Sequence, residues 1–461
     1  MPNYGDIDSI STTKTRPIRV FAKSVIGLAL RIFFRQIELH GLEKMPPKGP
    51  VMFVLNHINA LIDPGILLVT SPRPVSFLAK STLYTMPVVG GLVRGFDSIP
   101  IFRKMDSDGK RVDNSQTFVL ARKLLQNGGI LAIFPEGTSH SDPMLRPMKT
   151  GAARMALGAQ LDDLMIVPIG LDYEAKATFR SSVLLYFGEP FSPGTCTFTD
   201  AGEPGRSEVL ALTERIGAAL GEVVVQAEHA EALRLVERAE RIFTSQRVEA
   251  DGSDASLAER FELRRRFVAA YHRLKLEFPE RLQALEQAVV DYEQGAAELG
   301  LDPGAPLPAE VSWATGLVAG LRSLVILVVL LPVALAGVVL NYPIYRFVGV
   351  MAKRGAKGDD DMISTIKVIG SVVVFPVGWL ILTTMVYLYT HVAEVWLGLL
   401  FLPLSGYLAL QFFERFGRML GAARGLMILL TRRQVIGRMR EQRREIHDTI
   451  VALGDLVEDP A

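Results

Sequence analysis

Short apolar runs alternate with helical stretches through the first half of the chain. Each run has about the length of a buried strand, and the runs occupy residues 51–56, 75–79, 130–134, 165–171 and 183–188. Amphipathic stretches at 114–127 and 149–160 predict helices between some of them. Because alternating strands and helices build sheets whose faces are covered by helices, the pattern predicts an α/β domain with a largely parallel sheet over residues 37–204.

A basic amphipathic segment precedes this domain. Residues 16–36 contain no acidic residue, and their basic residues recur along one face of the predicted helix: Arg19, Lys23, Arg31 and Arg35. The helix either lies in the interface of an anionic membrane or packs on its own domain with the basic face in water. The missing acidic partners favour the membrane interface, so we interpret residues 1–36 as a polar N-terminus followed by an interface helix. Residues 1–15 do not resemble a secretory signal, and we expect the N-terminal domain to stay in the cytoplasm.

The pattern changes at residue 205. Residues 205–300 are rich in Ala, Leu, Glu and Arg, with helical periodicity that is broken at EADGSDAS (249–256) and at Pro279. We expect several amphipathic helices here, as a bundle or an extended arm, and we find no catalytic pattern. A Pro-rich stretch, LDPGAPLP, opens a predicted linker at 301–312.

Three apolar runs follow the linker. Residues 323–340, 368–393 and 395–413 are uncharged, and about 20 apolar residues are enough to cross a membrane as a helix. They predict a membrane region over 313–413, followed by a basic tail at 414–461.

The charges around these runs predict their topology. Basic residues precede the second run and fill the tail, so the positive-inside rule puts both on the cytoplasmic side and makes 368–413 a transmembrane hairpin. Keeping the N-terminal domain cytoplasmic as well requires the first segment, 316–350, to enter and leave on one side. Pro332 and Gly337 within it permit such a re-entrant hairpin.

Composition excludes some classes of function. The formal net charge is +1 over 461 residues, which gives no electrostatic basis for binding nucleic acid. The single cysteine, Cys196, excludes an intramolecular disulfide. No Cys/His cluster in the sequence has the spacing of metal ligands.

Four short blocks lie in order within the α/β region. They read NHINALID at 56–63, IPIFRK at 99–104, FPEGTSH at 134–140 and VPIG at 167–170. In this order and spacing they resemble the glycerophosphate acyltransferase family, which includes 1-acylglycerol-3-phosphate and glycerol-3-phosphate acyltransferases. The resemblance covers residues 37–190 and implies a mixed sheet with flanking helices.

The spacing within the first block indicates one branch of this family. Five residues separate His57 from Asp63, whereas the commoner family block has four. Five is the spacing that we associate with the fungal-type glycerol-3-phosphate/dihydroxyacetone-phosphate acyltransferases, and FPEGTSH also resembles that branch.

Acyl transfer from a thioester to an alcohol requires a base. A neutral histidine can take the hydroxyl proton, while a carboxylate on its other ring nitrogen fixes the tautomer and stabilises the imidazolium. We assign His57 as the base and Asp63 as its partner. The alternative is a histidine at a strand end and an ordinary helix start, with Asp63 as the N-cap and Pro64 at the first helical position. Both hold if one carboxylate oxygen caps the helix and the other faces the imidazole.

An acceptor that bears a phosphate requires cationic and backbone donors. Arg103 is the candidate for pairing with the phosphate, because a guanidinium binds phosphate bidentately; Lys104 is a weaker candidate. Gly137, followed by Thr138, allows backbone N–H groups to approach an anion. Glu136 is itself acidic, so we expect it to hold Arg103 or a substrate hydroxyl.

Two further positions have simpler interpretations. Lys149 opens a predicted helix whose N-terminus attracts anions, but a surface lysine is the commoner case. His140 and Asp142 resemble a second dyad, although a polar loop is the preferred interpretation.

The sequence therefore predicts a membrane-bound O-acyltransferase of phospholipid and phosphatidic acid synthesis. The donor would be acyl-CoA or acyl-carrier protein, and the acceptor glycerol-3-phosphate or 1-acylglycerol-3-phosphate. The resemblance implies no metal, no other cofactor and no covalent acyl-enzyme; the expected partners are the two substrates and the lipid bilayer, with no nucleic acid. An acyltransferase for another lysolipid and a catalytically inactive membrane scaffold remain as alternatives, and the intact set of candidate residues argues against the scaffold.

Overall fold

The computed structural model describes residues 17–86, 89–103, 113–200, 202–251, 255–305, 307, 313–356, 360–431 and 433–458. They form two compact units. Unit 1 comprises Met1–Gln226 together with Ala352–Val368, and unit 2 comprises Ala227–Met351 together with Ile369–Ala461. The expected N-terminal polar segment and Lys104 lie outside the described residues.

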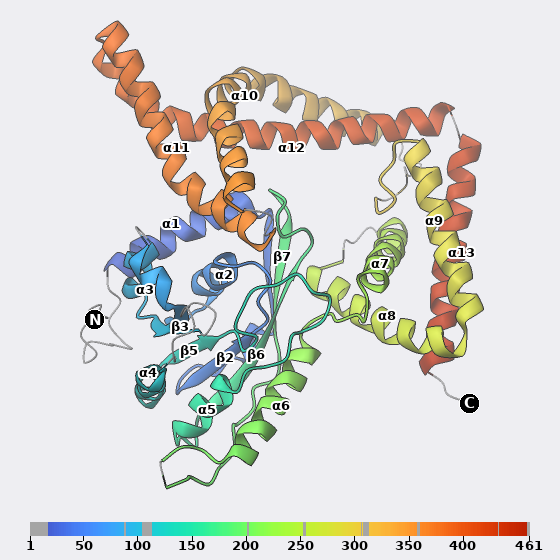
Figure 1. Ribbon diagram of the computed structural model, residues 1–461. Helices are drawn as coiled ribbons and strands as arrows, with labels where there is room; N and C mark the ends of the chain where they lie inside the picture. Colours follow the sequence, from blue (N-terminus) through green and yellow to red (C-terminus); the bar gives the residue numbers. More distant parts are fainter. Residues whose placement is uncertain are drawn as a thin grey trace. The chain divides into compact units, whose positions relative to one another are not determined.

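A mixed sheet lies at the centre of unit 1, with seven strands in the described part of the chain (Figure 1). The strands are β1 (Gln36–His40), β2 (Val51–Leu55), β3 (Val75–Lys80), β4 (Ile99–Ile101), β5 (Ile130–Ile133), β6 (Met165–Tyr173) and β7 (Ser182–Phe187). Their order is β1-β7-β6-β2-β5-β3-β4, and all neighbours are parallel except β6 and β7. The predicted α/β class with a mixed sheet is confirmed.

Two strands are not predicted by the apolar pattern. β1 reads QIELH and alternates polar with apolar residues at the edge of the sheet, while β4 has three residues with Pro100 at its centre. Neither produces the continuous apolar run by which a buried strand is recognised. The remaining strands coincide closely with the predicted runs.

Helices cover both faces of the sheet (Figure 1). Because successive side chains of a strand point to opposite faces, Phe53 and Leu55 pack against α1 (Pro17–Phe33) and α2 (Ile62–Thr70). Met52 and Val54 pack on the other face, where the covering helices are α4 (Ser115–Gln126), α5 (Gly151–Gly158) and α6 (Arg206–Glu222). The short α3 (Val89–Gly95) precedes β4.

Helix α6 extends unit 1 beyond the boundary expected at residue 204. Its buried residues join the core on the α4 and α5 face of the sheet: Val209, Leu212, Ile216 and Leu220. Helical periodicity alone does not distinguish a helix that covers a sheet from one in a separate bundle, which explains the misplaced boundary.

Helix α1 is held on unit 1 by its basic residues, while apolar residues face outward. Arg19 donates to the Phe96 carbonyl at 3.0 Å and pairs with Asp97 Oδ2 at 3.3 Å, and Lys23 Nζ donates to the Ser71 carbonyl at 3.0 Å. The outward side chains include large apolar residues: Val20, Phe21, Leu28 and Ile32. The expectation that the basic stripe lacks acidic partners is therefore wrong for Arg19.

A segment from much later in the sequence also belongs to unit 1. It contains the end of α10 (Trp313–Gly355) and the start of α11 (Asp360–Thr390). Val368 of α11 packs in the same core cluster as α1 and α2. The unit that carries the sheet is thus assembled from two separate parts of the chain.

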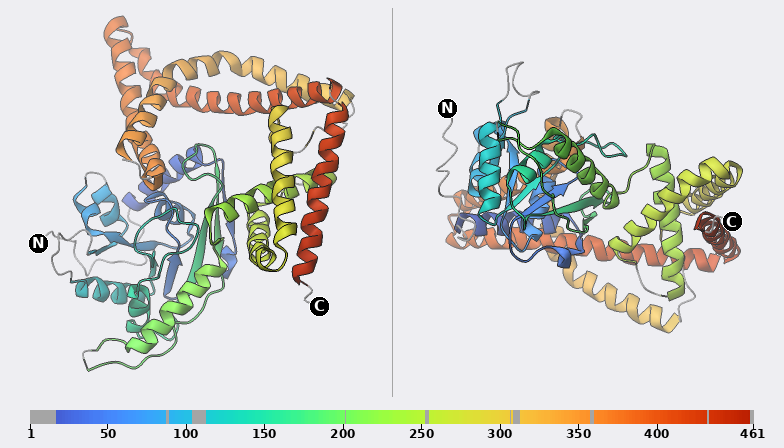
Figure 2. Two further views of the ribbon diagram at one scale, coloured as in Figure 1. Left: turned by 45° about the vertical axis from the view of Figure 1, so that its right-hand side comes forward. Right: turned by 90° about the horizontal axis from the view of Figure 1, so that it is seen from below.

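Among the described helices of unit 2, four share an apolar core: α7 (Ala230–Asp251), α8 (Leu257–Glu277), α9 (Pro279–Glu298) and α13 (Arg433–Glu458). Figure 2 shows α9 and α13 running side by side. The predicted breaks coincide with helix boundaries, because Ser256 and Glu259 form a capping box at α8 and Pro279 begins α9.

Described parts of the expected tail and linker, namely α13 and residues 301–305, pack in this bundle. Arg443 of α13 is 1% exposed, and its guanidinium donates to the Tyr292 hydroxyl and to the carbonyls of Pro303 and Ala305. These bonds connect the described part of the Pro-rich stretch to α13. A buried guanidinium needs such acceptors, because an unpaired buried charge is strongly destabilising.

Three helices among the described residues are long and apolar enough to cross a membrane: Gly320–Gly355, Met362–Thr390 and Ala393–Gly425. The last includes most of α12 (Gly398–Thr431). The re-entrant hairpin expected at 316–350 is wrong, because α10 continues through Pro332 and Pro343 without reversing. A proline inside a helix removes one hydrogen bond and bends the axis, which does not by itself turn the chain back. The sides of the membrane on which the helix ends lie stay predictions.

Candidate active site

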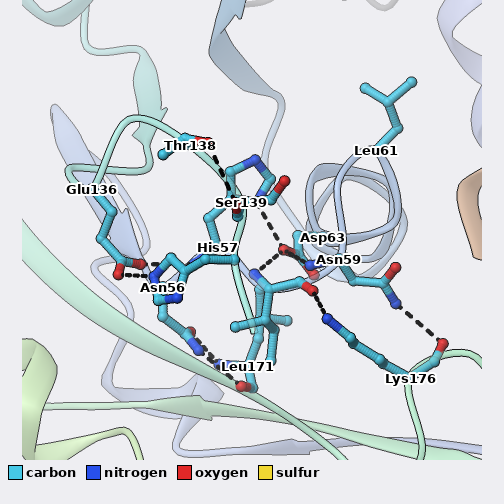
Figure 3. Close-up of polar contacts among 12 residues, drawn as sticks. Asn56, His57, Asn59, Leu61, Asp63, Glu136, Thr138, Ser139, Leu171 and Lys176 are labelled. Atoms are coloured by element: carbon cyan, nitrogen blue, oxygen red, sulfur yellow. Dashed lines mark hydrogen bonds and ion pairs between the residues drawn. The ribbon is translucent and has the colours of Figure 1, made fainter. Parts of the chain in front are cut away.

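Strand β2 ends where the first sequence block begins. Asn56 is 2% exposed, and its side-chain amide donates to the Leu171 carbonyl at 3.0 Å and accepts from the Leu171 N–H at 2.7 Å. These two bonds take the place of the next pair of ladder bonds between β2 and β6. The backbone can therefore leave the sheet at His57, which lies at the carboxyl end of β2 (Figure 3).

His57 and Asp63 are in direct contact. His57 Nδ1 lies 2.8 Å from Asp63 Oδ2, and the Asp63 side chain is fully buried while that of His57 is 18% exposed. A carboxylate only accepts hydrogen bonds, so Nδ1 carries the proton and Nε2 is left as the basic nitrogen. The imidazole also stacks on Phe134 at the end of β5, with ring centroids 4.0 Å apart. The geometry predicted for the pair is present.

The capping role expected of Asp63 is wrong. Helix α2 begins at Ile62, has Leu61 as its N-cap and has no side-chain capping bond, so Asp63 and Pro64 lie inside its first turn. Asp63 Oδ2 instead accepts from the N–H groups of Ile58 and Asn59 at 2.9 and 2.8 Å. One oxygen thus takes the imidazole and two loop amides, which fixes the turn between the paired residues.

The FPEGTSH block holds His57 through its backbone. The His57 N–H donates to Glu136 Oε1 at 3.0 Å, and the His57 carbonyl accepts from the His140 N–H at 3.0 Å. The other Glu136 oxygen accepts from the Arg146 N–H at 2.9 Å and from His140 Nε2. Glu136 is 2% exposed, and these bonds show a role that the sequence did not predict; the expectation that it holds Arg103 or a substrate hydroxyl stays a prediction. Its buried carboxylate positions His57.

His140 belongs to this support. It is 4% exposed, and its Nδ1 accepts from the Asp142 N–H at 3.2 Å, which leaves the Nε2 proton to point at Glu136. The hydrogen bond from Arg146 Nε to Asp142 at 2.7 Å lowers the pKa of that exposed carboxyl. His140 thus has a buried structural role that neither the polar-loop nor the second-dyad interpretation describes.

Two cationic side chains reach Gly137. Arg103 Nη1 donates to the Gly137 carbonyl at 3.2 Å. Gly137 has φ +78°, and Lys149 Nζ lies where the Cβ of any other residue would be, so the ammonium occupies the space beside that glycine. Thr138 donates to the Ser139 carbonyl at 3.3 Å. The structure therefore brings Arg103, Gly137 and Lys149 together, and the loop that carries them is the one that supports His57.

Tyr173 completes the surroundings of Asp63. Its hydroxyl donates to Asp63 Oδ1 at 2.6 Å from the end of β6. Burial raises the pKa of Tyr173 well above its ordinary value, and the charge of Asp63 and the hydrogen bond to it raise it further. Sequence reasoning missed Tyr173 and Asn56. Asn56 is adjacent to His57 in the first block, whereas no local signal links Tyr173 to a residue 110 positions earlier.

The His57–Asp63 pair thus lies at the carboxyl end of a strand in a mixed sheet that helices cover on both faces. Residues 36–172 match the acyltransferase family model, and residues 241–457 match the model of the glycerol-3-phosphate acyltransferase 2 C-terminal domain. The first of these segments is therefore similar to the acyltransferase family, and the second to the C-terminal domain of a glycerol-3-phosphate acyltransferase.

Curated relatives are similar over parts of their length. Glycerol-3-phosphate O-acyltransferase 2 of Saccharomyces cerevisiae is 28% identical over 58% of this chain and 37% of its own. Glycerol-3-phosphate O-acyltransferase 1 of the same yeast is 24% identical over 70% of this chain and 53% of its own. The 1-acyl-sn-glycerol-3-phosphate acyltransferase of Borreliella burgdorferi is 30% identical over 37% of this chain and 64% of its own. The chain thus spans about half or less of the length of the two yeast relatives.

Among solved structures, the 1-acyl-sn-glycerophosphate acyltransferase of Thermotoga maritima is 20% identical to this chain. The match covers 44% of this chain and 80% of that chain, with a TM-score of 0.32.

Proposed function

We propose that this protein transfers an acyl group from a thioester to a hydroxyl of a glycerol-phosphate acceptor at a membrane. The acceptor class is glycerol-3-phosphate or 1-acylglycerol-3-phosphate, and the donor is acyl-CoA or acyl-carrier protein. The observation that carries the proposal is the contact of His57 Nδ1 with Asp63 Oδ2 at 2.8 Å, which leaves Nε2 as the basic nitrogen. The relatives named for this chemistry support the acceptor class.

In the proposed reaction His57 acts as a general base. Its Nε2 takes the proton of the acceptor hydroxyl as that oxygen attacks the thioester carbonyl carbon. Asp63 stabilises the resulting imidazolium and keeps the ring in the required tautomer. The tetrahedral intermediate then collapses, the C–S bond breaks, and the leaving sulfur takes the proton from the imidazolium. The attacking hydroxyl belongs to the substrate, so this scheme uses no covalent acyl-enzyme, metal or other cofactor.

The acceptor phosphate is assigned to the region around Gly137. Arg103 and Lys149 approach this residue, and two cations next to a glycine at positive φ form a site suited to an anion. Because Gly137 follows Glu136, which holds the His57 backbone, a phosphate here would place an attached glycerol hydroxyl near the imidazole. Thr138, the next residue along the chain, is proposed as a further hydrogen-bond donor to this phosphate.

Two features of the chain support its location at a membrane. The three long apolar helices can cross a bilayer, and the exposed apolar residues of α1, led by Phe21 at 70% exposure, suit its interface. Acceptors with acyl chains would then reach the site from the bilayer. The cytoplasmic location of the sheet unit is part of the proposal and rests on the distribution of basic residues.

The test is an assay of the purified full chain in lipid nanodiscs with radiolabelled acyl-CoA. The acceptors are glycerol-3-phosphate, dihydroxyacetone phosphate, 1-acylglycerol-3-phosphate and a lysolipid without a phosphomonoester. We expect activity with at least one phosphomonoester acceptor and its loss in His57→Ala. His272→Ala is the matched control, because His272 lies exposed on α8, where it pairs with Glu228. Activity equal in wild type and His57→Ala would remove His57 as the base, and inactivity on all phosphomonoesters would contradict the acceptor class.

A further inference from the structure

The loop between the paired residues is strained. Ala60 has φ +34°, a backbone conformation that an alanine rarely adopts. The loop nevertheless has to hold the N–H groups of Ile58 and Asn59 against Asp63 Oδ2. Strained conformations of this kind persist only where the surrounding structure enforces them, so the contacts that hold the loop from outside are important.

One set of outside contacts comes from the residues after β6. Lys176 Nζ donates to the Ile58 carbonyl at 2.9 Å, and Asn59 Nδ2 donates to the Lys176 carbonyl at 3.3 Å (Figure 3). The first half of the loop is therefore tied to Lys176 at two points.

The second set comes from the start of α11, within unit 1. The Leu61 N–H donates to Thr365 Oγ1 at 3.1 Å across 304 positions of sequence. Leu61 is the N-cap of α2, which has no side-chain cap of its own, so the Thr365 hydroxyl supplies an acceptor that the local sequence lacks. Thr365 is 3% exposed, and water does not readily replace it.

Its neighbours fix Thr365 in place. Ser364 is buried and donates from its hydroxyl to the Lys176 carbonyl, the same oxygen that holds Asn59. Lys367 Nζ donates to the Ala177 carbonyl at 2.8 Å, and Val368 packs into the core beside α2. These contacts join the α11 start to both halves of the loop.

We infer that Thr365, supported by Ser364, is a positioning residue for the His57–Asp63 pair. It acts through the Leu61 N–H and the strained loop, and it touches neither substrate nor the reacting atoms. The residue is supplied by the first turns of a helix that continues as an apolar membrane-crossing candidate. The active site of the sheet unit is thus completed by the C-terminal part of the chain. The kinetic part of this inference rests on the proposed acyltransferase function.

The test compares Thr365→Val, Thr365→Ser and Thr384→Val in the full chain in nanodiscs. Valine keeps the shape and removes the acceptor, whereas serine retains it. Thr384 is the matched control, because it lies on the same helix and its hydroxyl bonds only to the Leu380 carbonyl. Losing one bond to a partly buried N–H is expected to lower kcat about tenfold in Thr365→Val, with both KM values within about twofold of wild type. Thr365→Ser and Thr384→Val should keep kcat within about threefold of wild type.

Hydrogen exchange of peptides covering 57–63 supplies a readout that does not depend on activity. Thr365→Val should speed exchange there, and the two other variants should not. An unchanged kcat in Thr365→Val, or an equal loss in Thr384→Val, would overturn the positioning role. If wild type were inactive on every acceptor, the proposed function would fail. Faster exchange in Thr365→Val alone would then still support the role of Thr365 in holding the loop. Unchanged exchange in Thr365→Val would overturn that role.

Discussion

The hydroxyl of Tyr173 donates a 2.6 Å hydrogen bond to Asp63 Oδ1, the carboxylate oxygen that does not face His57. Asp63 thereby has donors on both oxygens: Tyr173 on one, and His57 with two loop amides on the other. Its side chain is fully buried, so these donors satisfy the carboxylate oxygens in place of water and fix their orientation. Tyr173 therefore determines how the carboxylate is presented to the imidazole.

Tyr173→Phe should lower kcat about tenfold while leaving both KM values close to wild type. The substitution removes the donor without changing the ring, and an unsatisfied buried acceptor costs about 1–3 kcal/mol. Some of this cost is expected in the transition state, where Asp63 must face a charged imidazolium. Steady-state kinetics with varied donor and acceptor concentrations test whether kcat falls while both KM values stay unchanged. A selective rise of one KM would instead place Tyr173 in that substrate's pocket.

Tyr173 should also make stability depend on pH at the alkaline end. Its folded-state pKa lies above the unfolded value of about 10, because burial and Asp63 disfavour the phenolate. The stability that comes from keeping the phenol neutral is fully present below pH ~10 and is lost as the pH rises beyond it. Thermal denaturation midpoints measured from pH 8 to 11 should fall more steeply for wild type than for Tyr173→Phe. Parallel curves would show that Tyr173 does not contribute.

Glu136→Gln should reduce kcat by about tenfold to a hundredfold and lower the melting temperature. The carboxylate accepts from the N–H groups of His57 and Arg146 and from His140, and an amide replaces one acceptor oxygen by a donor that faces another donor. Kinetics and thermal denaturation measure the two effects. Glu189→Gln is the matched control, since Glu189 is largely exposed and pairs with Lys44. Comparable behaviour of the two variants would contradict a positioning role for Glu136.

Arg103→Ala should raise the acceptor KM at least tenfold and change the thioester KM by less than about threefold. The guanidinium lies at the Gly137 carbonyl, where the acceptor phosphate is assigned. Lys149→Ala should have the same selectivity with a smaller effect, because a flexible ammonium binds phosphate without the bidentate geometry. Arg215→Ala is the control, since Arg215 is on α6 and donates to the carbonyls of Ser192 and Pro193. A larger change in the thioester KM would move Arg103 to the donor site.

The sequence predicted the features that depend on short-range pattern. Apolar runs predicted the central strands. The first block predicted the contact between His57 and Asp63, because a turn of this length returns the chain on itself. The same pattern misplaced the capping role of Asp63. The carboxylate of Asp63 caps the loop amides in front of it, and residue type alone does not specify which N–H groups a side chain selects.

Features that depend on long-range packing could not be predicted from short-range sequence pattern. Glu136 has the residue type of a substrate ligand, and only its burial under the His57 backbone shows its structural role. Thr365 lies just before the apolar run at 368–393, in a charged stretch where an isolated hydroxyl carries no signal. In both cases the partner is distant in sequence, and tertiary structure alone determines the contact.

A buried polar network connects the three apolar helices of unit 2. Asn341 of α10 is 8% exposed, donates from Nδ2 to Gly337 O at 2.9 Å and Leu402 O at 3.3 Å, and accepts from Trp379 Nε1 at 2.8 Å. Leu402 belongs to α12 and Trp379 to α11, so a single amide contacts all three helices. In a bilayer core such bonds have no competition from water, although measured values average only about 0.6 kcal/mol and reach about 2 kcal/mol.

Asn341→Ala should therefore destabilise the packing of these helices by about 1–2 kcal/mol. Trp379→Phe removes the same bond from the other side, so a double-mutant cycle isolates the pair, and a coupling of about 0.5 kcal/mol or more is expected. Unfolding in mixed micelles with increasing SDS measures each variant. Additive effects in the cycle would mean that the Asn341–Trp379 bond contributes nothing to the fold, and that the loss in Asn341→Ala arises from its contact with α12.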